Sequence, residues 1–475
     1  MKKIARRTFL KSATAATVPW QIVPRHVLGG GQTPPSEKLN IASIGVGGQG
    51  RGDFARVAQA ANDNMLAICD VDPAQSSMLQ RDRAVGAIAQ KCKVFTDYRK
   101  MLDEIKEIDA VVIATHDNMH AMVSMEAIRR GKHVYCEKPL THDVWEARQV
   151  AEAARKAKLA TQMGNTGQAS AEPRRMCELV WSGVIGPVRE AHIWTDRPSN
   201  GLFNEYWPQG VARPTDTPPV PTGMDWDLWI GGAPMRPYHP AYHTFKWRGW
   251  WDFGTGALGD MGCHRFDPVF RALKLGAPTS VQASSTRVND ETYPVGSMVT
   301  YYFPPRDEQV QAINTHVRGL NGRAAGGQPM PPVKLTWYDG GLRPPRPQGM
   351  PEGDTMGDNG ILLVGDKGYI LDNRVYPESL RKDMDATERL PASPGGHFLE
   401  WINACKGKLP AAGSNFDWAG PLTEAVLLGD VALRSTIRKL LPQHKLDWDA
   451  AALKFTNLDA ANQYLRREYR KGWEL

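Results

Sequence analysis

A glycine-rich turn between two short apolar segments constrains this 475-residue chain more than any other feature. Residues 38–44 read as a strand that runs into Gly45-Val46-Gly47-Gly48-Gln49-Gly50, and a helix follows the turn. A second apolar strand, residues 65–69, ends at Asp70. The order strand, G-x-G-x-x-G turn, helix, strand and acid is typical of the βαβ unit that binds a dinucleotide.

The residues of this unit have separate physical roles. Gly45 permits the tight turn, Gly47 lets the backbone approach a pyrophosphate, and Gly50 lets the helix pack on the strand. The N-terminus of the helix faces the phosphates. We expect Asp70 to bind both ribose hydroxyls, and because a carboxylate there repels a 2′-phosphate we expect NAD rather than NADP.

The alternation of helix and strand continues as far as residue 165. The sequence predicts strands at residues 109–115, 132–138 and 160–165. It predicts helices at 96–102, 116–131 and 143–157. This pattern predicts an α/β fold, with an N-terminal Rossmann domain built on a doubly wound parallel sheet over residues 37–165.

One of these strands ends in a charged pair. Pro139 lacks an N–H and fixes φ, so the strand that contains Tyr135 and Cys136 stops after Glu137 and Lys138. In open α/β sheets ligands bind at the carboxyl ends of the strands. The pair is therefore a candidate for ligand contact, and the alternative is a solvated ion pair at a strand end.

Residues 166–475 do not continue this regular alternation of helix and strand. They predict an α+β domain with an open, mainly antiparallel sheet, with strands at 280–287, 296–303, 309–318, 333–338, 358–364 and 369–371. Loops are expected at 321–332 and 340–357, and helices at 397–406 and 422–441. We expect the far face of this sheet to cover the site and to mediate assembly into a homo-oligomer.

A long loop and a helix in this half contain candidate functional residues. Residues 196–250 are rich in Pro, Trp, Tyr and Gly, which fits either a lid and platform for a sugar ring or aromatic packing that orders the loop. The stretch from Asp260 reads as helical, and Asp260 and His264 share one face at a spacing of i and i+4. A surface ion pair or a capping aspartate is the alternative to a functional pair.

Together these motifs make the chain resemble the Gfo/Idh/MocA oxidoreductase family. The likeness covers most of residues 38–440, and the residues that carry it are the glycine turn at 45–50, Ala114-Thr115 with His120, Glu137-Lys138-Pro139 and the helix exit at 183–188. His116 departs from the family, which usually has proline after the threonine. This resemblance implies cofactor contacts from residues at strand ends, namely Thr115, His120, Glu137, Lys138 and Asn165.

The resemblance also implies the chemistry, which is hydride transfer between a sugar-like alcohol and NAD. Lys138, Asp260 and His264 would then line the substrate pocket. His264 fits the base that takes the hydroxyl proton, and Lys138 would stabilise the developing alkoxide. Asp260 would orient the imidazole or contact a substrate hydroxyl. The six cysteines lack metal-ligand spacing and make no disulfide framework, so we expect no metal and mostly buried thiols.

Residues 1–36 predict export. Arg6-Arg7-Thr8-Phe9-Leu10-Lys11 is a twin-arginine pattern, followed by an apolar run too short to span a membrane. This segment holds six Lys or Arg and no acid, so only about +1 of the formal charge of +7 remains for the rest, which argues against nucleic acid as a partner. We expect the twin-arginine machinery to export a protein that is periplasmic or secreted, with no membrane segment in its mature form.

Three functions remain open. The first function is that of an oxidoreductase that acts on a sugar or glycoside hydroxyl. Because little free NAD is available outside the cytoplasm, such an enzyme would keep its NAD tightly bound. The second is an NAD-dependent glycoside hydrolase or lyase that oxidises its sugar transiently and eliminates the glycosidic group. The Tyr-Pro-Thr-His signature of the N-acetylgalactosaminidase branch is absent. The third function is that of a non-catalytic sugar-binding protein. It is disfavoured because this sequence contains all three residues that the resemblance implies for catalysis, namely Lys138, Asp260 and His264.

Overall fold

The computed structural model describes residues 37–60, 62–199, 205–306, 330–383, 390–393, 395–440 and 444–475. The leader, the strand expected at 309–318 and most of the loop expected at 321–332 lie outside these ranges. Residues 39–475 form one unit. Among the described helices, none combines the length and the apolar character that crossing a bilayer requires.

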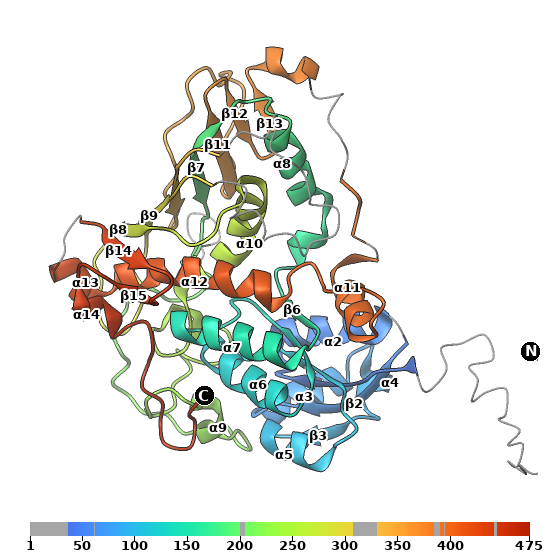
Figure 1. Ribbon diagram of the computed structural model, residues 1–475. Coiled ribbons are helices and arrows are strands. Elements are labelled where there is room, and N and C mark those ends of the chain that lie inside the picture. The colour runs from blue at the N-terminus through green and yellow to red at the C-terminus, as the bar shows by residue number, and fades with distance from the viewer. Residues whose placement is uncertain are drawn as a thin grey trace, which may run out of the picture. The chain divides into compact units, whose positions relative to one another are not determined.

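The first sheet confirms the predicted Rossmann domain (Figure 1). Its strands run in the order β3-β2-β1-β4-β5-β6, and every neighbouring pair is parallel. The order reverses between β1 and β4, which is where ligands bind in such sheets. The strands are β1 (Asn40–Ile44), β2 (Asn64–Cys69), β3 (Lys93–Phe95), β4 (Ala110–Ile113), β5 (His133–Cys136) and β6 (Thr161–Met163).

Helices connect these strands, and local sequence fixes where several of them begin. The Asp72 side chain accepts a hydrogen bond from Ala74 N at the start of α3, and Asp97 does the same for Arg99 N at the start of α5. Asp143 and Glu146 form a capping box on α7. The helices are α2 (Gly48–Ala60), α3 (Pro73–Gln80), α4 (Gly86–Ala89), α5 (Tyr98–Glu104), α6 (Asp117–Arg129) and α7 (Val144–Ala157).

The second sheet confirms the prediction of an open, mainly antiparallel sheet. Its order is β13-β12-β11-β7-β10-β9-β8-β14-β15, and only β7 and β10 pair in parallel. Its longer strands are β7 (Val188–Trp194), β8 (Ser280–Ser285), β9 (Ser297–Phe303), β10 (Val333–Tyr338) and β11 (Gly360–Gly365). The short strands at its edges are β12 (Tyr369–Leu371), β13 (Arg374–Tyr376), β14 (Leu446–Asp449) and β15 (Lys454–Phe455).

Two helices of this domain begin earlier than the sequence predicts. Helix α10 (Gly256–Leu273) starts one turn before Asp260. Helix α12 (Phe416–Leu433) starts before Pro421 rather than after it, because the Asn415 side chain caps it by accepting from Asp417 N. The remaining helices are α8 (Ala171–Trp181), α9 (Trp226–Ile230), α11 (Gly396–Cys405), α13 (Ser435–Leu440) and α14 (Asp459–Asn462).

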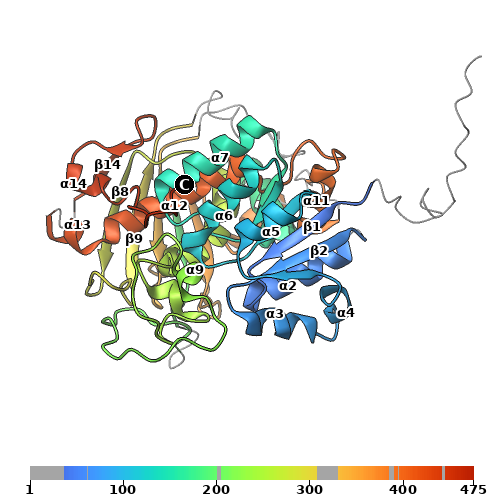
Figure 2. The same ribbon diagram turned by 90° about the horizontal axis from the view of Figure 1, so that it is seen from below.

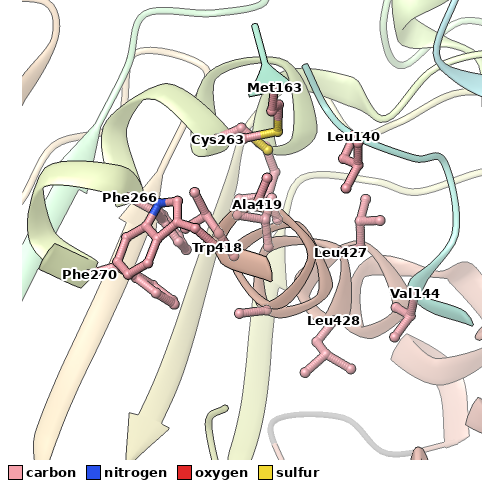
Figure 3. Packing of buried hydrophobic residues seen from close by; sticks show 14 of the residues in the cluster. Leu140, Val144, Met163, Cys263, Phe266, Phe270, Trp418, Ala419, Leu427 and Leu428 are labelled. Atoms are coloured by element: carbon pink, nitrogen blue, oxygen red, sulfur yellow. The ribbon is translucent and has the colours of Figure 1, made fainter. Parts of the chain in front are cut away.

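Helix α12 joins the two domains through apolar packing. It contacts α7 of the first domain and α10, β8 and β9 of the second. Figure 3 shows Leu427 of α12 beside Leu140, which follows β5, and Trp418 beside Phe266 and Phe270 of α10. All five side chains are buried, and burying a leucine or phenylalanine side chain stabilises a fold by about 1.5–3 kcal/mol. This packing holds the segment after β5, which contains Lys138, near the helix that carries Asp260.

Helix α11 returns to the first domain although it follows the second sheet in sequence. It packs on α2 (Figure 1). The Tyr135 ring of β5 stacks on Phe398 with centroids 5.1 Å apart and meets Trp401 edge-on at 5.7 Å. The Rossmann core is therefore completed by residues from the far end of the chain.

The long irregular segment predicted at 196–250 is confirmed over its described residues, with only α9 and a 3-10 turn at Lys246–Gly249. An apolar cluster of its own orders it: Met224, Trp229, Ile230, Ala233, Tyr242, Trp247, Trp250 and Phe253. In Figure 2 the green loops around α9 lie next to the blue Rossmann elements. Asp225 N donates to Val71 O over 3.0 Å, which ties this segment to the residue after Asp70.

Candidate active site

A cavity of about 660 Å³ opens at the carboxyl ends of β1, β2, β4 and β5. Its walls come from both domains and from the irregular segment. The lining residues include Gly45, Gly47, Asp70, Thr115, His116, Asp117, His120, Glu137, Lys138, Trp229, Trp247, Arg248, Asp260 and His264. The structure therefore brings most of the predicted site residues to one place.

The glycine turn at the end of β1 has no room for side chains. Gly45 has φ of +78°, and a Cβ there would lie 2.5 Å from Ala114 O. A Cβ on Gly50 would lie 2.0 Å from Gly45 O, and one on Gly47 would meet the Gln75 side chain at 2.7 Å. Both main-chain clashes are too short for any residue except glycine, so the turn and the start of α2 form the cradle that a pyrophosphate needs.

Asp70 stands at the end of β2 and lines the cavity. Its Oδ2 accepts a hydrogen bond from Val46 N at 2.9 Å, and its Oδ1 accepts one from Asp72 N at 3.0 Å. Burial raises the pKa of Asp70 to about 6, although these amides act in the opposite direction. Each oxygen keeps a second lone pair, so the carboxylate is fixed in place and can still accept from ribose hydroxyls.

Lys138, Asp260 and Arg248 form one charged cluster. Lys138 Nζ donates to Asp260 Oδ1 at 2.7 Å and to the Asp260 carbonyl at 3.0 Å. Arg248 Nε donates to the same Oδ1 at 3.0 Å. Burial alone would raise the pKa of Asp260, but the charges of Lys138 and Arg248 hold this pKa below its ordinary value. The cluster of two cations and one anion leaves a net positive charge at the cavity wall.

His264 lies one helical turn after Asp260 and lines the same cavity. No described residue makes a hydrogen bond to its ring, and Asp260 binds Lys138 and Arg248 instead of orienting this imidazole. Burial lowers the pKa of His264 to about 3, and the charge of Lys138 acts in the same direction. The ring is therefore neutral at physiological pH and can accept a proton.

His120 braces the two strand ends next to Lys138. Its Nδ1 lies 2.6 Å from Pro139 O and its Nε2 lies 3.1 Å from Thr115 O. Burial lowers the pKa of His120. Because both ring nitrogens already face carbonyl oxygens, this residue positions the wall of the cavity and offers a ligand no free nitrogen.

Glu137 and Asn165 lie at neighbouring strand ends but differ in exposure to the cavity. Glu137 lines it, accepts from the Tyr135 hydroxyl at 3.3 Å, and sits so close to Gly164 that a Cβ there would lie 2.2 Å from its Oε1. Asn165 is buried and not among the lining residues, and its amide has no hydrogen-bond partner within the described part of the chain. Its predicted contact with the cofactor remains a prediction.

Arg248 and Asp117 line the cavity but were not predicted as site residues, whereas Trp229 and Trp247 belong to the loop for which a lid and platform was one of two expectations. Arg248 follows Trp247 in the irregular segment, where no periodicity links it to Asp260. Asp117 accepts from Thr255 Oγ1 at 2.6 Å, which fixes the first turn of α6 against the start of α10.

The six cysteines are all unpaired, and five are buried, as predicted. In the parts of the chain that the structure describes, no three His, Cys, Asp or Glu residues gather as a metal site would require.

Two family models match this chain. Residues 39–165 match the NAD-binding Rossmann-fold model of the Gfo/Idh/MocA oxidoreductase family, and residues 174–303 match the model of its C-terminal alpha/beta domain. The crystal structure of the WlbA dehydrogenase from Bordetella pertussis in complex with NADH and UDP-GlcNAcA has the same fold. Its TM-score is 0.54 at 17% identity, and the match covers 87% of this chain and 99% of that one.

Curated relatives match over shorter segments. The glycosyl hydrolase family 109 protein 2 of Akkermansia muciniphila is 27% identical over 170 residues, which is 34% of this chain and 34% of that protein. Inositol 2-dehydrogenase 4 of Saccharopolyspora erythraea is 33% identical over 119 residues, which is 25% of this chain and 33% of that protein. The chain thus matches about a third of the length of each relative.

The glycine cradle, the fixed acid after β2 and Lys138 after β5 all lie within residues 39–165, which the NAD-binding model matches. The first domain is therefore an NAD-binding Rossmann domain, and the chain belongs to the Gfo/Idh/MocA oxidoreductase family.

Proposed function

We propose that this protein is an exported oxidoreductase that acts on a hydroxyl of a sugar or glycoside and keeps its NAD tightly bound. The observation that carries the proposal is the meeting of Lys138, Asp260 and His264 on the wall of the cavity that also contains the glycine turn. The twin-arginine pattern at Arg6-Arg7 supports export. Relatives named glycosyl hydrolase and inositol dehydrogenase support a polyhydroxylated substrate.

The residues of the first domain fit NAD. The turn from Gly45 to Gly50 and the N-terminus of α2 would hold the pyrophosphate, and Asp70 would hold a ribose. When bound, NAD would accept a hydride from the carbon that carries the reacting hydroxyl.

The protein's own side chains would handle the proton and the charge. His264 is neutral and lacks a partner within the described residues, so its ring would take the proton from the hydroxyl. The ammonium of Lys138 and the guanidinium of Arg248 would stabilise the negative charge that develops on this oxygen. Asp260 would hold both cations in position, because both donate to the same Oδ1.

Side chains from the irregular segment and from the C-terminal segment line the cavity, which supports retention of the cofactor. Trp229 and Trp247 line it from the irregular segment. His243 Nε2 of the irregular segment lies 3.2 Å from Asp72 Oδ2, close to Asp70, which would hold the ribose. Trp473 of the C-terminal segment also lines the cavity, and the Arg99 guanidinium lies 4.5 Å from the centre of the Trp473 ring. An exported enzyme with a cavity lined in this way would complete its redox cycle without exchanging NAD.

The second candidate is a glycoside hydrolase or lyase that oxidises its sugar, eliminates the glycosidic group and reduces the sugar again. Relatives named glycosyl hydrolase family 109 favour it. A transient ketone acidifies the neighbouring C–H, and the two cations at Asp260 would stabilise the resulting enolate.

One experiment separates the two candidates. The purified protein is incubated with a panel of sugars and aryl glycosides in D₂O, and products are analysed by mass spectrometry and NMR. Oxidised sugar or a second reduced product supports the oxidoreductase. Release of aglycone with deuterium on the carbon next to the oxidised position supports elimination. Binding of glycosides without either product would leave the third function, a sugar-binding protein, and overturn both.

A further inference from the structure

The ring of His116, a residue that lines the cavity, has one nitrogen without a hydrogen-bond partner among the described residues. His116 follows Thr115 at the end of β4, lines the cavity and is 8% exposed. Its ring packs against Trp229 and Trp247, with centroids 4.5 and 6.2 Å apart. This packing fixes the plane of the ring.

Asn118 fixes which nitrogen of that ring carries hydrogen. The Asn118 Nδ2 donates to Ile230 O at 3.1 Å, so the amide oxygen must point the other way, toward His116 Nδ1. An amide oxygen only accepts hydrogen bonds, and Nδ1 must therefore be the protonated nitrogen. Asn118 is itself anchored, because its N–H donates to Phe253 O at 3.1 Å and its carbonyl accepts from Arg467.

The other nitrogen, Nε2, is consequently an acceptor. Burial lowers the pKa of His116 to about 3, although the hydrogen bond to Asn118 acts in the opposite direction, so the ring stays neutral at physiological pH. No hydrogen bond to Nε2 comes from any residue that the structure describes, and the residue borders the cavity. A neutral acceptor at this wall suits a neutral donor on a ligand.

We propose that His116 Nε2 accepts a hydrogen bond from a hydroxyl group of the bound ligand. Two ligands of this site carry hydroxyls, the riboses of NAD and a sugar substrate. The sugar as donor rests on the proposed function, whereas a ribose as donor rests only on the NAD-binding domain. His116 would thus be a recognition residue, held in one tautomer by Asn118 and in one orientation by the tryptophans.

Two amide substitutions test this with the same chemistry at two positions. In His116→Gln the amide reaches the place of Nε2, whereas in His116→Asn it reaches only the place of Nδ1. Loss of one neutral hydrogen bond weakens binding by about three- to tenfold. We expect this three- to tenfold weakening of binding in His116→Asn. In His116→Gln the logarithm of the fold-change should be at most half as large.

Two readouts distinguish the source of the hydroxyl. The rate at which bound NAD leaves the protein, measured by capturing it with an NAD-consuming enzyme, reports a ribose. The KM for the glycosides that the panel identifies reports the substrate. A change in either readout, larger in His116→Asn than in His116→Gln at equal melting temperature, supports the proposal. Equal effects of both substitutions, or none on either readout, would overturn it.

A spectroscopic measurement keeps the proposal testable if the variants do not fold. Two-bond hydrogen–nitrogen correlation spectra of protein labelled with ¹⁵N-histidine report the tautomer of each ring. We expect Nδ1 of His116 to be protonated and Nε2 to show the shift of a hydrogen-bonded lone pair in the NAD complex or after a glycoside is added. A protonated Nε2 would contradict the proposal whatever the activity of the protein.

Discussion

Lys138 Nζ lies 2.7 Å from Asp260 Oδ1, so the segment that follows β5 and the second turn of α10 meet in one ion pair across the domain boundary. Both side chains are largely buried. Because α12 packs against both domains, this distance depends on the way the two domains are held together. His264, one turn further along α10, is brought to the same wall by the same packing.

Lys138 and His264 are expected to serve one proton transfer. Lys138→Ala and His264→Ala should each abolish turnover and leave bound NAD in place, since neither substitution touches the glycine turn. Their combined loss should be far smaller than the product of the single losses, because both act on one transition state. Turnover and NAD content of the three variants are measured side by side. Independent, multiplicative losses would show that the two residues do not act together.

Arg248, held at the cavity wall by Asp260, is expected to stabilise the developing charge together with Lys138. Its guanidinium stacks on Phe245 and Trp247 at 4.0 and 4.2 Å, which aims Nε at Oδ1. Arg248→Ala should lower kcat by about 10–100-fold with a smaller change in KM. Arg248→Lys should restore only part of this, because lysine lacks the planar group that stacks.

A control for this prediction comes from the same segment. Arg213 pairs with Glu291 at 2.7 Å and its side chain is half exposed. Arg213→Ala should change kcat by less than about twofold, as exposed ion pairs contribute little. An equal loss of kcat in Arg213→Ala and Arg248→Ala would mean that the segment as a whole, rather than the contact to Asp260, controls the rate.

The glycine turn should distinguish two alanine substitutions on one helix. A Cβ on Gly50 would lie 2.0 Å from Gly45 O, so Gly50→Ala must move the turn and should abolish NAD binding. Gly52 also lies in α2, but a Cβ there meets only the end of the Arg56 side chain at 3.7 Å. Gly52→Ala should keep NAD and raise the unfolding free energy by up to about 1 kcal/mol. Retention of NAD by Gly50→Ala would contradict the cradle.

Asp70 should set both the choice of cofactor and the pH dependence of its binding. Asp70→Ala should weaken NAD and admit NADP, since no carboxylate then repels the 2′-phosphate. The ionised carboxylate is the form that accepts from ribose hydroxyls, so NAD affinity should rise as pH increases through the free protein's pKa of about 6 and level off above it. Asp70→Asn should lose this rise. Tighter binding of NADP than NAD by the unchanged protein would refute the assignment.

Local sequence was sufficient for five of the six strands of the first sheet, all but the short and largely exposed β3, and for three residues of the site. The glycine turn, the apolar strands and the stop at Pro139 act within a few residues, so they predict β1, β2, β4 and β5 and place Lys138 at a strand end. The spacing of Asp260 and His264 likewise requires only a helix. These features follow from periodicity and from turn chemistry.

Other features depend on contacts that periodicity does not encode. Arg248 contacts Asp260 from the long irregular segment. Helix α11 packs on the first domain because Trp401 and Phe398 contact the Tyr135 ring. The helix expected at 422–441 begins earlier, because the cap at Asn415 starts α12 at Phe416. The strands β13–β15 are too short for an alternating pattern to show.

Retention of NAD is the property that most directly tests an exported enzyme with an enclosed cofactor. The ultraviolet spectrum and the cofactor content of the mature protein are measured after extensive dialysis, together with the rate with and without added NAD. We predict nearly stoichiometric NAD after dialysis, no increase in rate on adding NAD, and no accumulation of NADH in the steady state. Loss of the cofactor on dialysis, with activity that then depends on added NAD, would contradict this and identify an exchanging dehydrogenase.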